Sequence, residues 1–183
     1  DGHSILNRAF YGVPIFTNSE GLHTNAVFGF MNIMFKIIDS KQPDYMAVAF
    51  DVHQPTFRHE MFKDYKGTRK PMMEELREQV PVIKELLQKM NITTVELPGY
   101  EADDVIGTLS KKGEKAGMEV DVISGDRDLL QLASDHITIC IPKTKKGQTT
   151  VEEYNTEGVR KLYKVTPTEF IDVKALMGDS SDN

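Results

Sequence analysis

Four short runs of apolar and β-branched residues recur along the chain. They cover Met46–Phe50, Thr93–Leu97, Glu119–Ile123 and Ile137–Ile141. Runs of this length and composition are typical of buried β-strands. The pattern therefore predicts four strands.

Helical periodicity fills the intervals between these strands. Apolar residues recur every three or four positions in Asn25–Asp39, Leu76–Met90 and Asp103–Lys115. In the first of these helices, the predicted apolar face consists of Val27, Phe28, Met31, Met34, Phe35 and Ile38. Pro81 is expected to kink or divide the second helix, because proline has no backbone N–H to donate.

The alternation of strands and helices predicts an α/β domain with a parallel central sheet and helices on both faces. Near the C-terminus, Thr166–Glu169 has the residues of a capping box with proline at the first helical position, and Gly178 ends the predicted helix. The basic segment Pro142–Gln148 is predicted to form an exposed hairpin or loop.

The composition fits one globular domain. The chain has 183 residues, of which 39% are hydrophobic and 27% charged, and this length allows one sizeable core. No stretch reaches the roughly 18 apolar residues of a membrane span, and no signal peptide is visible. The single cysteine, Cys140, lies in a predicted strand. We therefore expect a cytoplasmic protein with no membrane partner and no organic cofactor.

The charges are unevenly distributed. A net charge of −6 alone argues against a phosphate-binding protein, but Arg58–Lys70 has five basic residues against two acidic ones, with aromatic residues interleaved. Such a segment is a candidate clamp on a nucleic-acid backbone. Its candidate binding residues are Arg58, Lys63, Tyr65, Lys66, Arg69 and Lys70. Without an acidic site beside it, a solvated helix would be the better interpretation.

Acidic residues follow the ends of three predicted strands. Asp51 follows the first strand, Glu101–Asp104 follows the second, and Asp126 and Asp128 follow the third. Because the carboxyl ends of parallel strands open on one edge of a sheet, these groups are expected to converge there. Asp1 would join them if a strand preceded it. Helix capping explains any one group about as well, but it does not explain all three at one edge.

A cluster of carboxylates needs cations. Two like charges ~4 Å apart repel by about 4 kcal/mol at an effective dielectric constant of ~20. Oxygen ligands select hard cations such as Mg²⁺ or Mn²⁺, and the five histidines show no metal-binding spacing. Several carboxylates suggest a pair of metal ions, the arrangement that hydrolyses phosphodiester bonds. The sequence thus predicts phosphoryl transfer to water.

The motifs occur in the order found in one nuclease family. The chain resembles the 5′ nuclease domain of bacterial DNA polymerase I, within the flap endonuclease family, over essentially its whole length. The segments that carry the resemblance are Asp1–Ser4, Ala49–Asp51, Thr56–Glu60, Tyr65–Arg69, Pro98–Asp104, Gly125–Leu129 and Met177–Asn183. Each motif is weak by itself, and their combination is specific.

The resemblance implies a PIN-like or resolvase-like core with a helical arch inserted at about residues 53–79. It also implies two or more Mg²⁺ ions, which Mn²⁺ could replace. The first metal ion would bind Asp1, Asp51, Glu101 and Asp103, with Asp104 close by. The second would share Asp103 and bind Asp126, Asp128, Asp179 and Asp182.

The activity that the resemblance implies is removal of 5′ flaps, RNA primers and damaged strands from branched or nicked DNA in replication and repair. Lys66 and Arg69 would be catalytic residues in the arch through which the 5′ strand passes, and Tyr65 would contact bases or backbone. The family's first strand would precede Asp1 and its duplex-binding region would follow Asn183. We therefore expect a fragment of a longer protein, with a DNA polymerase as the expected parent.

Two other interpretations compete with this one. A PIN-like ribonuclease also gathers carboxylates at a parallel sheet edge, but it leaves the basic segment between Asp51 and Leu76 and the late Gly178–Asp182 group unexplained. A Mg²⁺-binding fragment without turnover would bind branched DNA and leave it uncut. Comparing flap cleavage with cleavage of single-stranded RNA separates these possibilities.

Overall fold

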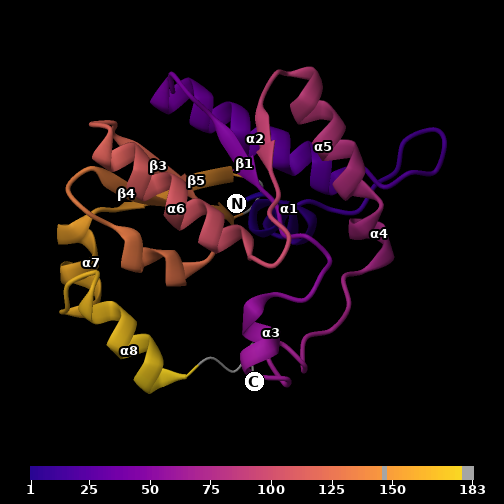
Figure 1. Ribbon diagram of the computed structural model, residues 1–183. Coiled ribbons are helices and arrows are strands. Elements are labelled where there is room, and N and C mark those ends of the chain that lie inside the picture. The colour runs from indigo at the N-terminus through magenta and orange to yellow at the C-terminus, as the bar shows by residue number, and fades with distance from the viewer. Residues whose placement is uncertain (146–147, 179–183) are drawn as a thin grey trace.

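A computed structural model describes residues 1–145 and 148–178. Helices and strands alternate along most of the chain, as Figure 1 shows. In chain order the elements are α1 (Gly2–Gly12), α2 (Asn25–Lys41), β1 (Ala47–Ala49), α3 (Phe57–Met61), α4 (Glu74–Arg77), α5 (Gln79–Lys89), β2 (Thr93–Val95), α6 (Ala102–Lys115), β3 (Val120–Ile123), the 3-10 helix η1 (Arg127–Leu132), β4 (Ile137–Lys145), β5 (Gln148–Tyr154), α7 (Thr156–Tyr163) and α8 (Glu169–Met177).

All four predicted strands form, and they pair in parallel two by two, in two separate sheets and not in the single predicted sheet. β1 pairs with β2 in the register Val48 to Thr94, and β3 pairs with β4 in the register Val122 to Ile139. β4 continues past its predicted end and turns into an antiparallel hairpin with β5. The sequence did not predict β5, because its alternation of threonine, valine and glutamate is that of a polar edge strand.

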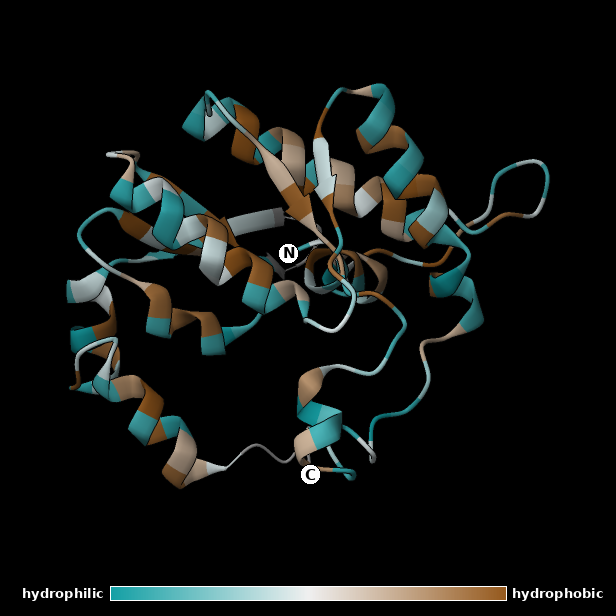
Figure 2. Ribbon diagram, in the orientation of Figure 1, coloured by the Kyte–Doolittle hydropathy of each residue, from teal (hydrophilic) through white to brown (hydrophobic). Residues whose placement is uncertain are grey.

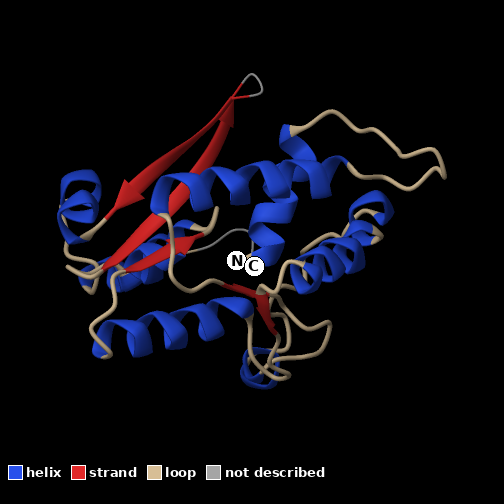
Figure 3. Ribbon diagram, turned by 90° about the horizontal axis from the view of Figure 1, so that it is seen from above, coloured by secondary structure: helices blue, strands red, loops and turns tan. Residues whose placement is uncertain are grey.

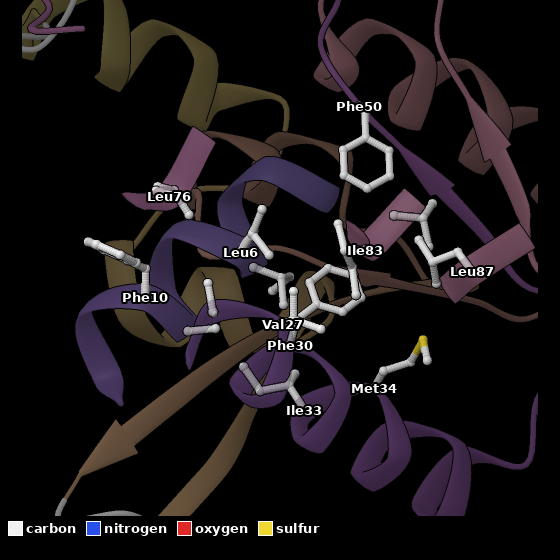
Figure 4. Close-up of a cluster of buried hydrophobic side chains, with 14 of the residues drawn as sticks. Leu6, Phe10, Val27, Phe30, Ile33, Met34, Phe50, Leu76, Ile83 and Leu87 are labelled. Atoms are coloured by element: carbon white, nitrogen blue, oxygen red, sulfur yellow. The ribbon is translucent and has the colours of Figure 1, made fainter. Parts of the chain in front are cut away.

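Two hydrophobic cores lie on opposite sides of the strands. One joins α1, α2, α5 and the end of β1, and Figure 4 shows its side chains, among them Leu6, Phe30 and Ile83. The other joins α6, η1, α7 and α8 to the inward side chains of β3 and β4. Seen from above in Figure 3, helices lie on both sides of the β3–β4–β5 sheet. The predicted α/β fold with helices on both faces is therefore confirmed.

Helix α2 forms where predicted, and its buried face agrees in part with the predicted one: Val27 and Met34 are buried, and Met31 and Ile38 pack against the core. Phe28 and Phe35 were expected in the core, and they are 53% and 46% exposed. The residues that pack against α1 and α5 instead include Phe30, Ile33 and Ile37. Because α2 is apolar on most of its circumference, several faces satisfied the periodicity, and only packing chose among them.

The predicted helix boundaries agree with the structure at two other places. The second helix divides into α4 and α5 around Glu78, shortly before Pro81, as expected of a proline that cannot donate to the preceding turn. At α8, the Thr166 backbone N–H donates to Glu169 Oε2 at 2.8 Å and the Glu169 N–H donates to Thr166 Oγ1 at 3.2 Å. Gly178 follows at a φ of 68°.

The segment between β1 and α5 projects from the rest of the fold. Figure 1 shows α3 at the lower edge of the molecule, joined by long connections to β1 and α4. This is the stretch for which an arch was predicted.

In Figure 2 most helices carry hydrophobic residues on one side and hydrophilic residues on the other. Within the part of the chain that the structure describes, no helix is both long and apolar enough to cross a bilayer.

Candidate active site

Most of the predicted site residues line one cleft of about 1450 Å³. The acidic residues among them are Asp1, Asp51, Glu101, Asp103, Asp104, Asp126 and Asp128. The residues predicted to bind nucleic acid that also line it are Arg58, Tyr65, Lys66, Arg69 and Lys70. Lys63 lies in the same projecting segment but does not line the cleft. Asp179 and Asp182 lie outside the described residues.

Three of these acids are positioned at helix starts. Asp1 is the N-cap of α1, and its Oδ1 accepts from the Ser4 backbone N–H at 3.0 Å. Glu101 is the N-cap of α6 and shares a capping box with Asp104. Asp126 is the N-cap of η1. The same acids therefore cap helices and converge on one cleft. Helix capping and a shared acidic site are not alternatives here, although the sequence suggested that they were.

Asp103 lies at the electrostatic centre of the cluster. Burial, together with the negative charges of Asp126, Asp51 and Glu101, raises its pKa from 3.8 to about 6. The nearby Lys66 only partly offsets this effect. Three acids that follow different strands thus act on one carboxyl, which agrees with the predicted convergence of these groups.

Basic residues of the projecting segment contact two of the acids. Lys66 Nζ donates to Glu101 Oε1 at 2.7 Å, and the Tyr65 hydroxyl donates to Glu101 Oε2 at 3.2 Å. Lys66 has a left-handed backbone with φ of 56°, a conformation that costs energy for a residue with a side chain. The segment therefore folds back over the carboxylates and partly neutralises them.

Arg58 holds Asp104 in a bidentate pair. Its Nη1 and Nη2 atoms lie 2.7 and 2.8 Å from the two carboxylate oxygens. This pairing lowers the pKa of Asp104 and raises the pKa of Arg58. Asp104 Oδ2 also accepts from the Glu101 backbone N–H. Both oxygens of Asp104 are thus engaged, which makes Asp104 less available to a metal ion than its neighbour Asp103.

The candidate ligands are of the type that hard divalent cations bind, although the described residues do not form a complete metal-binding site. Among the residues that the structure describes, no group of three or more His, Cys, Asp or Glu side chains is close enough to hold a metal ion. Mutual repulsion of the acids keeps their carboxylates apart. Two lysine side chains pair with acids of the cluster: Lys66 with Glu101, and Lys174 with Asp128 at 2.9 Å. All candidate ligands are carboxylates, the donors that Mg²⁺ and Mn²⁺ prefer.

Two serines that the sequence analysis did not single out connect the site. Ser124 Oγ donates to Asp1 Oδ2 at 2.7 Å and accepts from the Asp126 backbone N–H at 3.0 Å. Ser4 Oγ accepts from the Gly125 N–H at 2.8 Å. A Cβ on Gly125 would lie 2.9 Å from Ser4 Oγ, so this close approach requires glycine. The available signal was their position: Ser4 lies three residues after Asp1, and Ser124 comes directly after the third predicted strand.

Comparison with known proteins gives consistent matches. The family described as "5'-3' exonuclease, N-terminal resolvase-like domain" matches residues 1–164. DNA polymerase I of Bacillus caldotenax is 52% identical over 183 residues, which are 100% of this chain and 21% of that protein. DNA polymerase I of Caldicellulosiruptor bescii is 43% identical, with 100% and 22% coverage. The chain thus spans about a fifth of the length of these relatives.

Solved structures of phage enzymes have the same fold. A bacteriophage T5 flap endonuclease in a pseudo-enzyme–product complex with DNA and metal ions matches with a TM-score of 0.76 at 25% identity, covering 100% of this chain and 66% of that one. A T5 5′-exonuclease with bound zinc matches with a TM-score of 0.75 at 25% identity and the same coverage.

Proposed function

The chain belongs to the 5′-3′ exonuclease family, as its N-terminal resolvase-like domain, and from this membership we propose that it hydrolyses phosphodiester bonds near the 5′ ends of DNA strands. The preferred substrates in this proposal are branched or nicked DNA with a 5′ flap and RNA-primed DNA. The parent protein would be a DNA polymerase I, the name that the relatives carry. In this proposal it works in replication and repair in the cytoplasm.

One observation carries the proposal: carboxylates that follow three different strands and a basic segment face the same cleft. A nuclease needs both features, because the acids bind metal ions and the basic residues hold the polyanionic strand against them. A structural role for the acids does not account for the raised pKa of Asp103, since helix capping lowers the pKa of a carboxyl.

The proposed metal ligands divide into two sets. Asp1, Asp51, Glu101 and Asp103 would hold one Mg²⁺. Asp126 and Asp128 would hold the second, together with Asp103 and with Asp179 and Asp182, which lie outside the described residues. When bound, such a pair of ions lowers the pKa of water and offsets the charge that develops on the phosphate in the transition state.

The basic residues would act on the phosphate. Lys66 and Arg69 are proposed to stabilise the negative charge of the transition state from the arch. Lys66 now pairs with Glu101, so a bound strand and metal ion would release it for the phosphate. Tyr65 and Lys70 line the same wall and would contact bases or backbone. Arg58, already paired with Asp104, would mainly hold the base of the arch.

Single-turnover cleavage of a 5′-flap DNA by this chain tests the proposal. We expect cleavage with Mg²⁺ and none with EDTA. Asp103→Asn should lower the rate by more than the roughly 10–100-fold typical of changes in the outer shell of a metal site. Asp44→Asn, in an exposed loop that does not line the cleft, is the matched control. Cleavage confined to single-stranded RNA would favour a PIN-like ribonuclease, and binding without cleavage would favour a non-catalytic fragment.

A further inference from the structure

The first turn of α1 packs tightly against the end of β1. Gly2 lies so close to Phe50 that a Cβ at this position would be 2.3 Å from the Phe50 ring. This contact brings the next side chain, His3, edge-on to the same ring, with centroids 5.4 Å apart and planes at 87°. Glycine at position 2 is therefore what allows His3 to sit directly beside Asp51.

His3 accepts a hydrogen bond from the main chain of Asp51. The Asp51 backbone nitrogen lies 3.2 Å from His3 Nδ1. A backbone N–H can only donate, so Nδ1 carries no proton, and the neutral ring carries its proton on Nε2. The Asp51 carboxylate lies 3.7 Å from Nδ1, which is too long for a hydrogen bond. The contact thus acts on the backbone of Asp51.

Asp51 needs such support because it lies beyond the end of its strand. β1 ends at Ala49, and the Asp51 side chain is 49% exposed. On one side, its Oδ1 accepts from the Ala102 N–H at the start of α6, at 2.7 Å. On the other side lies His3, whose ring is only 18% exposed and is fixed by Phe50. Asp51 is therefore held between α1 and α6.

We propose that His3 is a positioning residue: its Nδ1 atom fixes the main chain at Asp51 and so aims this carboxylate into the cleft for metal binding. The predicted effect of His3 on cleavage rests on the proposed function. The hydrogen bond between His3 and Asp51 does not depend on that function. Small errors in ligand placement weaken a metal site, which gives the contact a functional consequence.

Two amide substitutions distinguish this positioning role from direct contact between His3 and the nucleic acid. Because His3 also lines the cleft, its Nε2–H could instead touch the nucleic acid. In His3→Asn the amide oxygen occupies the place of Nδ1 and can still accept from Asp51. In His3→Gln the amide reaches the place of Nε2, and the acceptor at the Nδ1 position is lost. His3→Leu removes both polar atoms.

Three measurements on the same chain test the assignment: Mn²⁺ affinity by calorimetry, single-turnover flap cleavage, and the amide exchange rate of Asp51 by NMR. We expect His3→Asn to remain near wild type in all three. His3→Gln and His3→Leu should weaken Mn²⁺ binding and slow cleavage by about 10–100-fold, and the Asp51 amide should exchange faster.

The reverse ranking, with His3→Gln active and His3→Asn impaired, would overturn the proposal. So would equal losses in all three variants accompanied by lower melting temperatures, because packing against Phe50 would then explain the effect. If the wild-type chain binds Mn²⁺ but cuts no substrate, the proposed function fails. The Mn²⁺ affinities and the Asp51 amide exchange would still decide the role of His3.

Discussion

Replacing Asp103 by asparagine should stabilise the metal-free protein while it abolishes cleavage. Burial and three neighbouring acids raise the pKa of Asp103 from 3.8 to about 6, so the folded state disfavours its ionised form. Each tenfold change in proton affinity corresponds to ~1.4 kcal/mol, and the elevation therefore costs about 3 kcal/mol at pH 7.5 as an upper limit. Asparagine is neutral at every pH and removes this cost.

The sign of the pH dependence follows from the same pKa. Between pH 3.8 and about 6 the folded state holds a proton on Asp103 that the unfolded state has released. Stability therefore falls as the pH rises through this window. Above it the penalty is complete, and below it the penalty disappears. The difference between Asp103→Asn and wild type should be largest at pH 7.5 and mostly lost at pH 4.5.

Thermal melting in EDTA measures this difference. For a chain of this size, ~1 kcal/mol shifts the midpoint by about 2–4 °C, so Asp103→Asn should melt several degrees above wild type at pH 7.5. Asp44→Asn, an exposed acid outside the cleft, should melt like wild type. If Asp103→Asn gains nothing at pH 7.5, or gains equally at pH 4.5, the electrostatic account of the cluster is wrong.

Three further predictions concern the metal ions, the arch and the core. Mg²⁺ or Mn²⁺ at about 100 times its dissociation constant should stabilise the wild type by about 2.7 kcal/mol, measured as a melting shift relative to EDTA, and Asp103→Asn should reduce that shift. Lys66→Ala and Arg69→Ala should slow single-turnover cleavage on the order of 10² or more if they stabilise transition-state charge. Gln79→Leu should lower the free energy of unfolding by about 2–4 kcal/mol in urea denaturation, because the buried Gln79 Oε1 accepts from the Ala26 and Val27 N–H groups at the start of α2. The control is Gln88→Leu, at an exposed position of α5.

Each of these predictions has an outcome that contradicts it. Coincident melting curves in Mg²⁺ and EDTA would show that the acids bind no metal ion. A large melting change in Lys66→Ala with an unaltered cleavage rate would make its pair with Glu101 purely structural. An unchanged urea midpoint for Gln79→Leu would show that water replaces the lost acceptor at the start of α2.

The sequence predicted strands and sheet-edge acids well because both depend on local pattern. Asp51 comes directly after an apolar run and Asp126 comes three residues after one, and both line the same cleft although their strands pair in different sheets. The orientation of α2 was not predictable in this way. Phe28 and Phe35 are as apolar as Phe30, and only the packing of α1 and α5 decides which of them is buried.

Contacts between distant segments were the second limit. Lys66 and Glu101 pair across the cleft, and no spacing in the sequence indicates it. The same is true of Ser124, which joins Asp1 to the loop after β3. These contacts depend on how α1, the projecting segment and the strand ends approach one another. Local pattern predicts the presence of such residues, and tertiary structure decides their partners.

Capping and metal binding favour the same residues at the same places, which is why the sequence left the two explanations nearly balanced for each acidic group taken alone. An acid at a helix start beyond a parallel strand is suited to both roles, as Glu101 and Asp126 show. Asp103 distinguishes the two explanations. It lies at the second position of α6, one residue before Asp104, whose carboxylate takes part in the capping box. The folded state disfavours its ionised form, so the proposed metal binding offers a reason for a carboxylate at this position that helix capping does not.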